Sequence, residues 1–217
     1  MGAEAAGAGV PHEVGWLKLA EQGRLVLASA SPRRARLLEL MGVPFEVHPS
    51  DVSERVEAKE PAERALLLAE AKARAVESSH PEGLLLGGDT EVVLEGRILG
   101  KPSSPREAHK MILELRGRSH KVVTGLYLLD APSGIGVSGV EETNVSMRRF
   151  SDAEAAVYAY SGEPMDKAGG YGIQGKGAVL VESLEGCYYN VVGLPLARLA
   201  VMMERLWGAL NTEGRCG

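Results

Sequence analysis

Hydrophobic and polar positions follow two patterns along this chain, and together they predict a protein with both helices and strands. Continuous apolar runs, which are typical of buried strands, occur at residues 25–27 and 84–86. Apolar residues at the three- and four-residue spacing of a helix recur at 61–76, and a proline opens that segment. We predict helices at 11–23, 32–41, 61–76, 104–116, 151–160 and 195–210, and strands at 24–28, 44–47, 84–86, 91–99 (a hairpin), 120–129, 135–150, 178–183 and 188–192.

The order of these elements favours an α/β fold with a mixed sheet. Helices separate the first strands, as in parallel units, whereas tight turns at 95–96 and 132–134 join later strands in antiparallel fashion. With 217 residues, of which 45% are hydrophobic, the chain can bury one sizeable core or two packed lobes. We expect residues 1–23 to be a partly disordered N-terminal extension, 24–210 to be the folded domain and 211–217 to be a tail.

Charge and cysteine content narrow the class of function. The formal net charge is −5, so no broad basic surface is available for nucleic acid. Two cysteines, Cys187 and Cys216, make neither a disulfide framework nor a zinc site, and this favours a reducing, cytoplasmic setting. No apolar run is long enough to span a membrane, and the N-terminus lacks the pattern of a signal peptide.

The most informative segment follows the first predicted strand. Ser31 and Pro32 are suited to begin a helix, and Arg33 and Arg34 then fall in its first turn. Cations at this end oppose the helix dipole, so their placement calls for another reason. Free N–H groups and two guanidinium groups would together bind a phosphate chain. The alternative is a capped helix with two solvated arginines.

A carboxylate and several lysines are further candidates for chemistry. Asp89 follows an apolar strand and two glycines, where it could hold a divalent metal or act as a general base; alternatively it is a turn residue that caps Thr90. Lys72, Lys101 and Lys167 could each contact phosphate oxygens, or could each be solvated. Lys72 has the strongest position, because small residues on its helix permit close packing.

The glycine-dense segment 171–177 has neither the dinucleotide-binding nor the P-loop pattern. Its single amide side chain, Gln174, offers both a donor and an acceptor, which suits the edge of a nucleobase. The alternative is a flexible hairpin loop. No histidine or cysteine cluster has the spacing of zinc ligands, and no GxSxG element occurs.

Seven segments in order make the chain resemble the Maf family of nucleoside triphosphate pyrophosphatases. They span nearly the whole predicted domain. They are ASASPRR at 28–34, EAKAR at 70–74, GGDT at 87–90, GKP at 100–102, TG at 124–125, SGEPMDKAGGYGIQGKG at 161–177 and NVVGLPL at 190–196.

The resemblance implies an elongated, ITPase-like mixed sheet with flanking helices and two lobes around a central cleft. It implies hydrolysis of a nucleoside triphosphate between its α- and β-phosphates, with Mg²⁺ or Mn²⁺ and with a homodimeric assembly. By position, Asp89 is similar to the family's proton acceptor, and Asp89 and Glu54 to metal ligands. The resemblance places the remaining substrate-binding positions at Ser29, Arg33, Arg34, Glu54, Lys72, Thr90, Lys101 and Gln174.

Gln174-Gly175 and the run from Glu163 to Gly169 are similar to the branch that acts on dTTP and UTP. A glutamine can pair with N3–H and a carbonyl of a pyrimidine, whereas the sister branch, which acts on 7-methyl-GTP, has a glutamate there. That branch remains an alternative, as does a nucleotide-binding regulator of septum formation, a process to which family members have been linked. One departure is Glu91, where we expect an apolar residue; we predict that Glu91 faces solvent.

Overall fold

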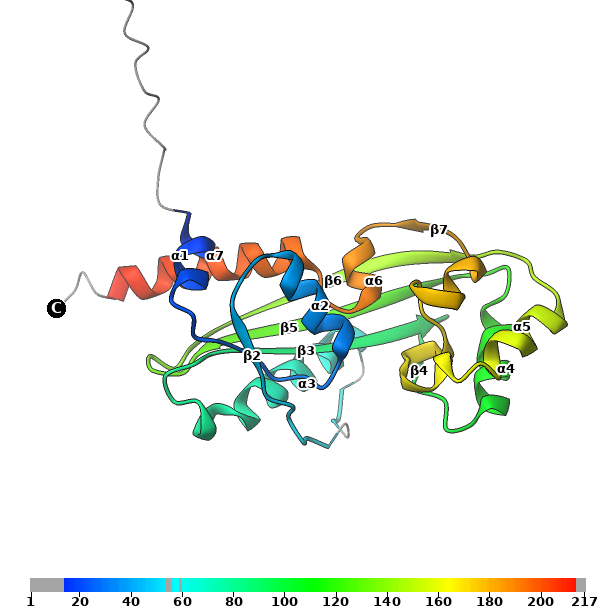
Figure 1. Cartoon of the computed structure of the whole chain (residues 1–217), viewed down its shortest axis with the longest axis horizontal. Helices are drawn as coiled ribbons and strands as arrows, with labels where there is room; N and C mark the ends of the chain where they lie inside the picture. Colours follow the sequence, from blue (N-terminus) through cyan, green and yellow to red (C-terminus); the bar gives the residue numbers. More distant parts are fainter. Residues whose placement is uncertain (1–13, 54–55, 59, 214–217) are drawn as a thin grey trace, which may run out of the picture.

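The described residues of the computed structural model, 14–53, 56–58 and 60–213, form an α/β fold around one long, mixed, seven-stranded sheet (Figure 1). The strand order is β2-β1-β3-β5-β6-β7, and β4 pairs with β3 beside this path. Only the β1–β2 and β1–β3 pairs are parallel. The strands are β1 (Leu25–Leu27), β2 (Phe45–Val47), β3 (Leu84–Leu94), β4 (Arg97–Leu99), β5 (Ser119–Asp130), β6 (Ile135–Met147) and β7 (Val181–Glu185).

Helices cover both faces of the sheet. The α-helices are α1 (Gly15–Glu21), α2 (Pro32–Leu40), α3 (Pro61–Ala75), α4 (Pro105–Leu115), α5 (Asp152–Ala159), α6 (Tyr188–Val192) and α7 (Leu196–Glu213). Short 3₁₀ turns are η1 (Glu77–Ser79), η2 (Glu163–Asp166), η3 (Ala168–Gly170) and η4 (Gly175–Leu180). None of the helices in the described part of the chain has both the length and the apolar character needed to cross a membrane.

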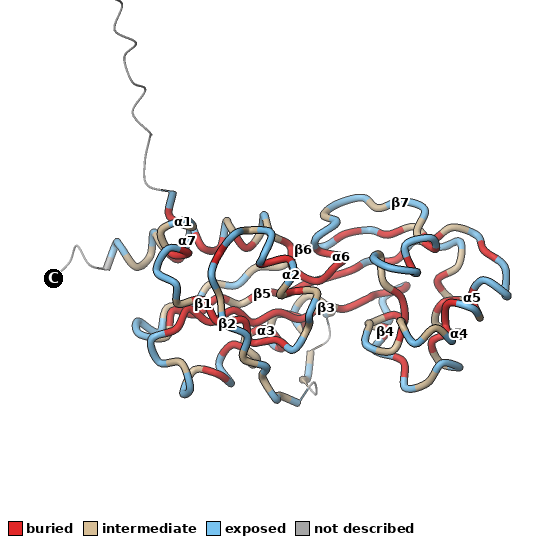
Figure 2. The backbone as a smooth tube through the Cα atoms, viewed as in Figure 1, coloured by how far each residue is buried: buried red, intermediate tan, exposed pale blue. Residues whose placement is uncertain are grey.

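Alternation along the strands separates the cores. Leu84 and Leu86 pack with residues of α1, α2 and α7, whereas Leu85 packs against α3 on the opposite face. A further core lies at the other end of the sheet, where α4 and α5 pack on the ends of β3, β5 and β6. The end of the sheet that carries α1, α2, α3 and α7 forms one lobe, and the end that carries α4 and α5 forms the other. Figure 2 shows buried backbone running along the long strands between these two lobes.

The sheet has a gap along one edge of β3. On one side β5 pairs with β3 continuously from Leu84 to Val93. On the other side, β1 pairs with β3 only as far as Leu86, and β4 pairs with β3 only from Val92 onward. Residues 87–91 therefore have no strand partner on that edge among the described residues, although they lie in the middle of an unbroken strand.

Helix α3 lies unusually close to the sheet beside this gap. A Cβ added to Gly87 would lie 1.9 Å from the Ala69 carbonyl oxygen, and one added to Gly125 would lie 2.4 Å from the Ala65 carbonyl carbon. Gly125 is the β5 partner of Asp89. The close approach therefore needs glycine at both strand positions and brings α3 directly over Asp89.

Most predicted elements are confirmed within a few residues, including the hairpin of β3 and β4, which turns at Glu95-Gly96. The capping box of Ser151 and Glu154 is also confirmed. Ser31 occupies the N-cap position of α2, but its side chain makes no capping hydrogen bond. The prediction of a helix at 11–23 is confirmed at Gly15–Glu21, and residues 11–13 lie outside the described part.

Three predictions about strands need correction. Strand β3 does not stop at Leu86 but continues to Leu94, so Asp89 is not at a strand end. Residues 178–180 belong to η4, and the strand begins at Val181. The segment 188–192 is the helix α6, not a strand, because buried Asn190 donates to the Val122 carbonyl and to Thr143 Oγ1 and so fixes a helical turn on the sheet.

A buried histidine links β5 to the segment after η3. His120 is 3% exposed, and its Nε2 lies 2.6 Å from the Tyr171 hydroxyl oxygen. Its buried Nδ1 has no hydrogen-bond partner in the described structure. Burial lowers the pKa of His120 from 6.5 to about 4, so the folded protein holds this ring neutral at pH 7.

Acidification should destabilise the fold through His120. Between the unfolded pKa of 6.5 and the folded pKa of about 4, the unfolded chain binds a proton that the folded chain does not. The contribution of neutral His120 to the free energy of unfolding is therefore fully present above pH 6.5, and it is lost as the pH falls through this window. For a shift of this size, we expect a loss of about 2 kcal/mol between about pH 7.5 and pH 5 in the free energy of unfolding, measured with urea. The variant His120→Gln should lose clearly less over the same range; an identical loss would contradict this role.

Candidate active site

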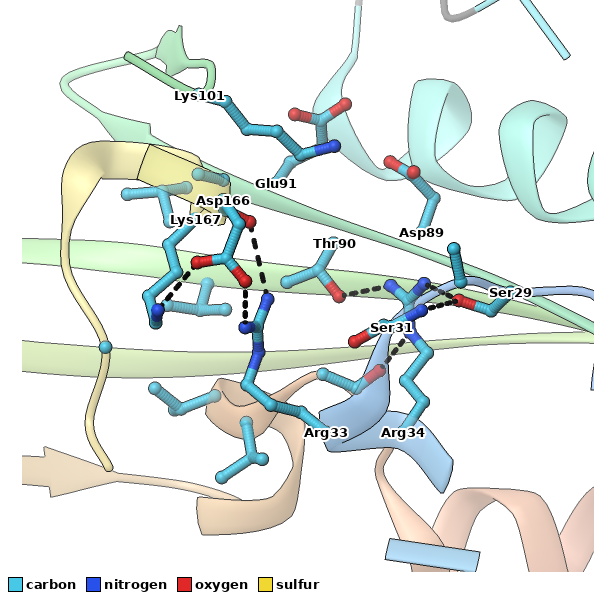
Figure 3. Close-up of a pocket in the computed structure, with 18 of the residues that line it drawn as sticks. Ser29, Ser31, Arg33, Arg34, Asp89, Thr90, Glu91, Lys101, Asp166 and Lys167 are labelled. Carbon is cyan, nitrogen blue, oxygen red and sulfur yellow. Dashed lines mark hydrogen bonds and ion pairs between the residues drawn. The ribbon is translucent and has the colours of Figure 1, made fainter. Parts of the chain in front are cut away.

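A cavity of about 450 Å³ lies between the two lobes, at the open edge of β3. Its volume is in the usual range for small-molecule sites. The lining comes from the β1–α2 segment, β3, α3, the loop after β4 and residues 166–174. Figure 3 shows Asp89, Glu91 and Lys101 on one side of the cavity and Arg33 and Arg34 on the other. The cavity thus presents acidic and basic side chains to the same space.

Asp89 is the carboxylate that the sequence analysis singled out, and it lines this cavity. Asp89 is 8% exposed, and Lys72 Nζ on α3 donates to Asp89 Oδ1 at a distance of 2.5 Å. Small residues on the buried face of α3 let the helix approach closely enough for the lysine to reach the strand. Lys72 therefore lines the cavity beside Asp89, and its role toward phosphate stays a prediction.

Glu91 also lines the cavity, two residues further along the same face of β3. The prediction that it faces solvent is wrong: Glu91 is 4% exposed and forms an ion pair with Arg64 on α3. Arg64 and Lys72 are eight positions apart on the helix, and each cation pairs with one of the two carboxylates. An ionic residue is tolerated at this buried position because its partner comes from the helix above.

The oxygen donors present fit a divalent cation that is shared with substrate. Mg²⁺ is commonly held by one or two carboxylates together with substrate phosphates, and Asp89 and Glu91 offer two carboxylates on one face. No group of three or more histidine, cysteine or acidic side chains suited to a metal occurs in the described ranges. The other predicted ligand, Glu54, lies outside the described residues.

Arg34 forms hydrogen bonds with three segments of the cavity wall. Its Nη1 donates to Ser29 Oγ at 3.0 Å, its Nη2 to Thr90 Oγ1 at 3.1 Å and its Nε to the Gly193 carbonyl at 2.8 Å. Thr90 Oγ1 also lies 2.9 Å from Thr124 Oγ1. The arginine is buried, so it ties the start of α2 to β3 and to the segment after α6.

Arg33 spans the cavity to the opposite lobe. Its Nη1 donates to Asp166 Oδ2 at 2.6 Å, and Lys167 Nζ donates to the other oxygen of that carboxylate at 2.7 Å. Burial acts to raise the pKa of Asp166, but hydrogen bonds from Lys167 and Arg33 outweigh it and lower the pKa to about 2. Asp166 therefore stays ionised and occupies the guanidinium group that the sequence assigned to phosphate.

The remaining predicted residues line the rim. Lys101, in the loop after β4, is exposed and lies beside the carboxylates in Figure 3. That loop is held by a hydrogen bond of 3.0 Å from the Gly169 N–H to the Gly100 carbonyl. Gln174 is also exposed and lines the cavity. Every predicted site residue within the described ranges is thus brought to one cavity.

Three cavity residues were not identified from the sequence. Glu91 and Arg64 are partners in space, and nothing in their separation along the chain indicates the contact. Asp166 lies next to Lys167 in the glycine-rich region, but its pairing with Arg33 joins residues 133 positions apart. A buried acidic residue in a strand of otherwise apolar pattern was the one available signal, and it was interpreted as solvent-facing.

Most of this chain is similar in sequence to known proteins. Residues 24–206 match the family described as Maf-like protein. A dTTP/UTP pyrophosphatase from Moorella thermoacetica is 48% identical over 190 residues, which is 85% of this chain and 98% of that protein. A dTTP/UTP pyrophosphatase from Carboxydothermus hydrogenoformans is 46% identical over 185 residues, which is 85% of this chain and 99% of that protein.

Among solved structures, a HAM1 protein from Coxiella burnetii shares 16% identity with a TM-score of 0.44, over 87% of this chain and 98% of that chain. The sequence matches are far stronger and extend over both lobes of the cavity. With a family match from residue 24 to residue 206 and relatives nearly half identical over most of their length, this chain belongs to the Maf family.

Proposed function

We propose that this protein hydrolyses dTTP and UTP to the nucleoside monophosphate and pyrophosphate. The observation that carries the proposal is the Asp89 carboxylate, held by Lys72 at the open edge of β3 and facing a cavity that also contains Arg33 and Lys101. Relatives that carry the name dTTP/UTP pyrophosphatase support the substrate class.

The triphosphate would lie along the open edge of β3, between the cations of the two lobes. Arg33 at the start of α2 and Lys101 after β4 would neutralise its charge from opposite sides. Phosphate oxygens would compete with Asp166 for Arg33, so substrate binding would exchange one anionic partner for another. Ser29 and Arg34 would keep the α2 end of the cavity in place through their hydrogen bonds.

Asp89 would act as the proton acceptor. A water oxygen attacks the α-phosphorus, the bond between the α-phosphorus and the bridging oxygen breaks, and pyrophosphate leaves; the water proton passes to the Asp89 carboxylate. Lys72 orients that carboxylate through its hydrogen bond. Mg²⁺ or Mn²⁺, held by Asp89 and Glu91 with Glu54 as a further candidate, would supply charge neutralisation at the phosphate oxygens. Most of the rate gain would come from position and electrostatics.

Gln174 would select the base. Its amide can accept from N3–H and donate to a carbonyl oxygen of uracil or thymine, and it lines the same cavity as Asp89. A guanine presents two donors on the corresponding edge, which suits a carboxylate better. The side chain at position 174 therefore favours pyrimidines over 7-methyl-GTP.

The variant Asp89→Asn tests the catalytic assignment. Because an amide cannot accept the proton, kcat for dTTP should fall by about 10²–10⁴-fold, measured by pyrophosphate release with Mg²⁺ or Mn²⁺. The matched control is Asp152→Asn, an exposed carboxylate that does not line the cavity and should leave kcat unchanged. Full turnover by folded Asp89→Asn would remove Asp89 from this role. Binding without turnover by the parent protein would instead favour a nucleotide-binding regulator.

The variant Gln174→Glu tests base selection. A carboxylate has no donor for the pyrimidine carbonyl, so kcat/KM for UTP and dTTP should fall by about 10–100-fold relative to 7-methyl-GTP. The measurement is pyrophosphate release from each triphosphate at the same cation concentration. An unchanged order of preference would show that the base is recognised elsewhere.

A further inference from the structure

The segment that carries Gln174 is a small closed loop. A Cβ added to Gly177 would lie 2.3 Å from the Gly172 carbonyl oxygen, so the two ends of the loop 172–177 touch. Gln174 is at its exposed tip, where it lines the cavity. Gly175, which follows it, has a φ of +70°, a conformation that favours glycine. The direction of the Gln174 side chain therefore depends on what fixes this loop.

Glu163, in η2, holds one side of the loop. Its Oε2 accepts from the Lys176 N–H at 2.9 Å and its Oε1 from the Gly177 N–H at 3.1 Å. A Cβ added to Gly175 would lie 2.9 Å from Glu163 Oε2, so the backbone passes directly against the carboxylate. One side chain thus satisfies two consecutive backbone donors just after Gln174.

Tyr158, in α5, holds the other side. Its hydroxyl accepts from the Gly172 N–H at 3.0 Å and donates to Glu163 Oε1 at 3.1 Å. The tyrosine is 4% exposed and packs in the core formed with α4. Backbone N–H groups on both sides of Gln174 therefore donate to the same pair of side chains, Tyr158 and Glu163.

The pair is itself anchored. Glu163 N–H donates to Ser161 Oγ, and Lys167 Nζ donates to the Glu163 carbonyl oxygen. Burial acts to raise the pKa of Glu163, but the backbone N–H groups of Lys176 and Gly177 and the Tyr158 hydroxyl outweigh it and lower the pKa below its ordinary value. The carboxylate is thus ionised at neutral pH, and its hydrogen bonds to the loop are charge-assisted.

We propose that Glu163 and Tyr158 are positioning residues for base selection: they fix the loop 172–177 so that the Gln174 amide meets the base in one orientation. This inference rests on the proposed function. A freely rotating amide could pair with uracil, which has an N3–H donor and an O4 acceptor, or with cytosine, which has the reverse order. Discrimination between the two bases therefore needs the amide to be fixed in one orientation. Glu163 and Tyr158, which together form the clamp, can do this without touching the nucleotide.

Steady-state pyrophosphate release with UTP and CTP tests the proposal. Both Glu163→Gln and Tyr158→Phe should raise KM for UTP by about tenfold with kcat changed by less than about threefold, because each removes loop hydrogen bonds and leaves Asp89 in place. The UTP/CTP ratio of kcat/KM should fall by about tenfold. Tyr160→Phe and Glu182→Gln, at exposed residues that do not line the cavity, should match the parent. A fall in kcat alone, or an unchanged UTP/CTP ratio, would overturn the proposal.

A double-mutant cycle separates positioning from general damage. If Glu163 acts through Gln174, then Glu163→Gln should change kcat/KM for UTP by less than about threefold in a Gln174→Ala background. A full tenfold loss in that background would mean that Glu163 acts by another route. Where Glu163→Gln fails to fold, the same cycle is run with Tyr158→Phe.

Amide hydrogen exchange of the whole chain, without nucleotide, tests the clamp independently of activity. Exchange at Lys176 and Gly177 should be about tenfold faster in Glu163→Gln, and exchange at Gly172 about tenfold faster in Tyr158→Phe. Unchanged exchange rates at these three amides would show that Glu163 and Tyr158 do not hold the loop. Failure of the parent protein to hydrolyse UTP would contradict the proposed function instead, and the exchange rates would still decide whether the loop is held as inferred.

Discussion

The site depends on one constraint: β3 must stay paired with β5 from Leu84 to Val93 while its other edge is left open from residue 87 to residue 91. The continuous pairing supports the backbone of residues 87–91 from one side. The open edge gives a ligand access to the middle of a strand, which neighbouring strands normally cover. Glycine at positions 87 and 125 then lets α3 approach until Lys72 and Arg64 meet Asp89 and Glu91. The chemistry is thus placed on a strand, where its backbone is held more firmly than in a loop.

The short segment η2 connects the two ends of the cavity. Asp166 at its end pairs with Arg33, and Glu163 at its start holds the loop that carries Gln174. Asp166, which substrate would release from Arg33, is thus three positions from Glu163, which holds the loop that carries Gln174. One short turn thus contributes both to the contact with Arg33 and to the support of the loop that carries Gln174.

The sequence predicted much of this arrangement because local patterns carry much of the fold. Apolar periodicity located the helices, and helix-starting residues such as Pro32, Ser104 and Ser151 marked where three of them begin. Ordered motifs indicated the family and, with it, the residues that line one cavity. The predictions of helices and strands succeeded where the physical cause is local in the chain.

The failures have a shared cause in tertiary contacts. The two glycines before Asp89 suggest the end of a strand, but Gly87 admits α3 and Gly88 lies against Leu126 and Arg34, contacts that no local signal shows. Tyr188 to Val192 has the composition of a strand, yet Asn190 binds two distant strands and makes the segment helical. Glu91 was assigned to solvent because its partner Arg64 is 27 residues earlier, on a different element.

A crystal structure with a non-hydrolysable dTTP analogue, bridged between the α- and β-phosphates, tests the central claim most directly. The account predicts that the triphosphate lies along the open edge of β3, with the α-phosphorus facing Asp89 and with Arg33 moved from Asp166 to a phosphate oxygen. A triphosphate bound away from residues 87–91, with the Arg33–Asp166 pair unchanged, would contradict it.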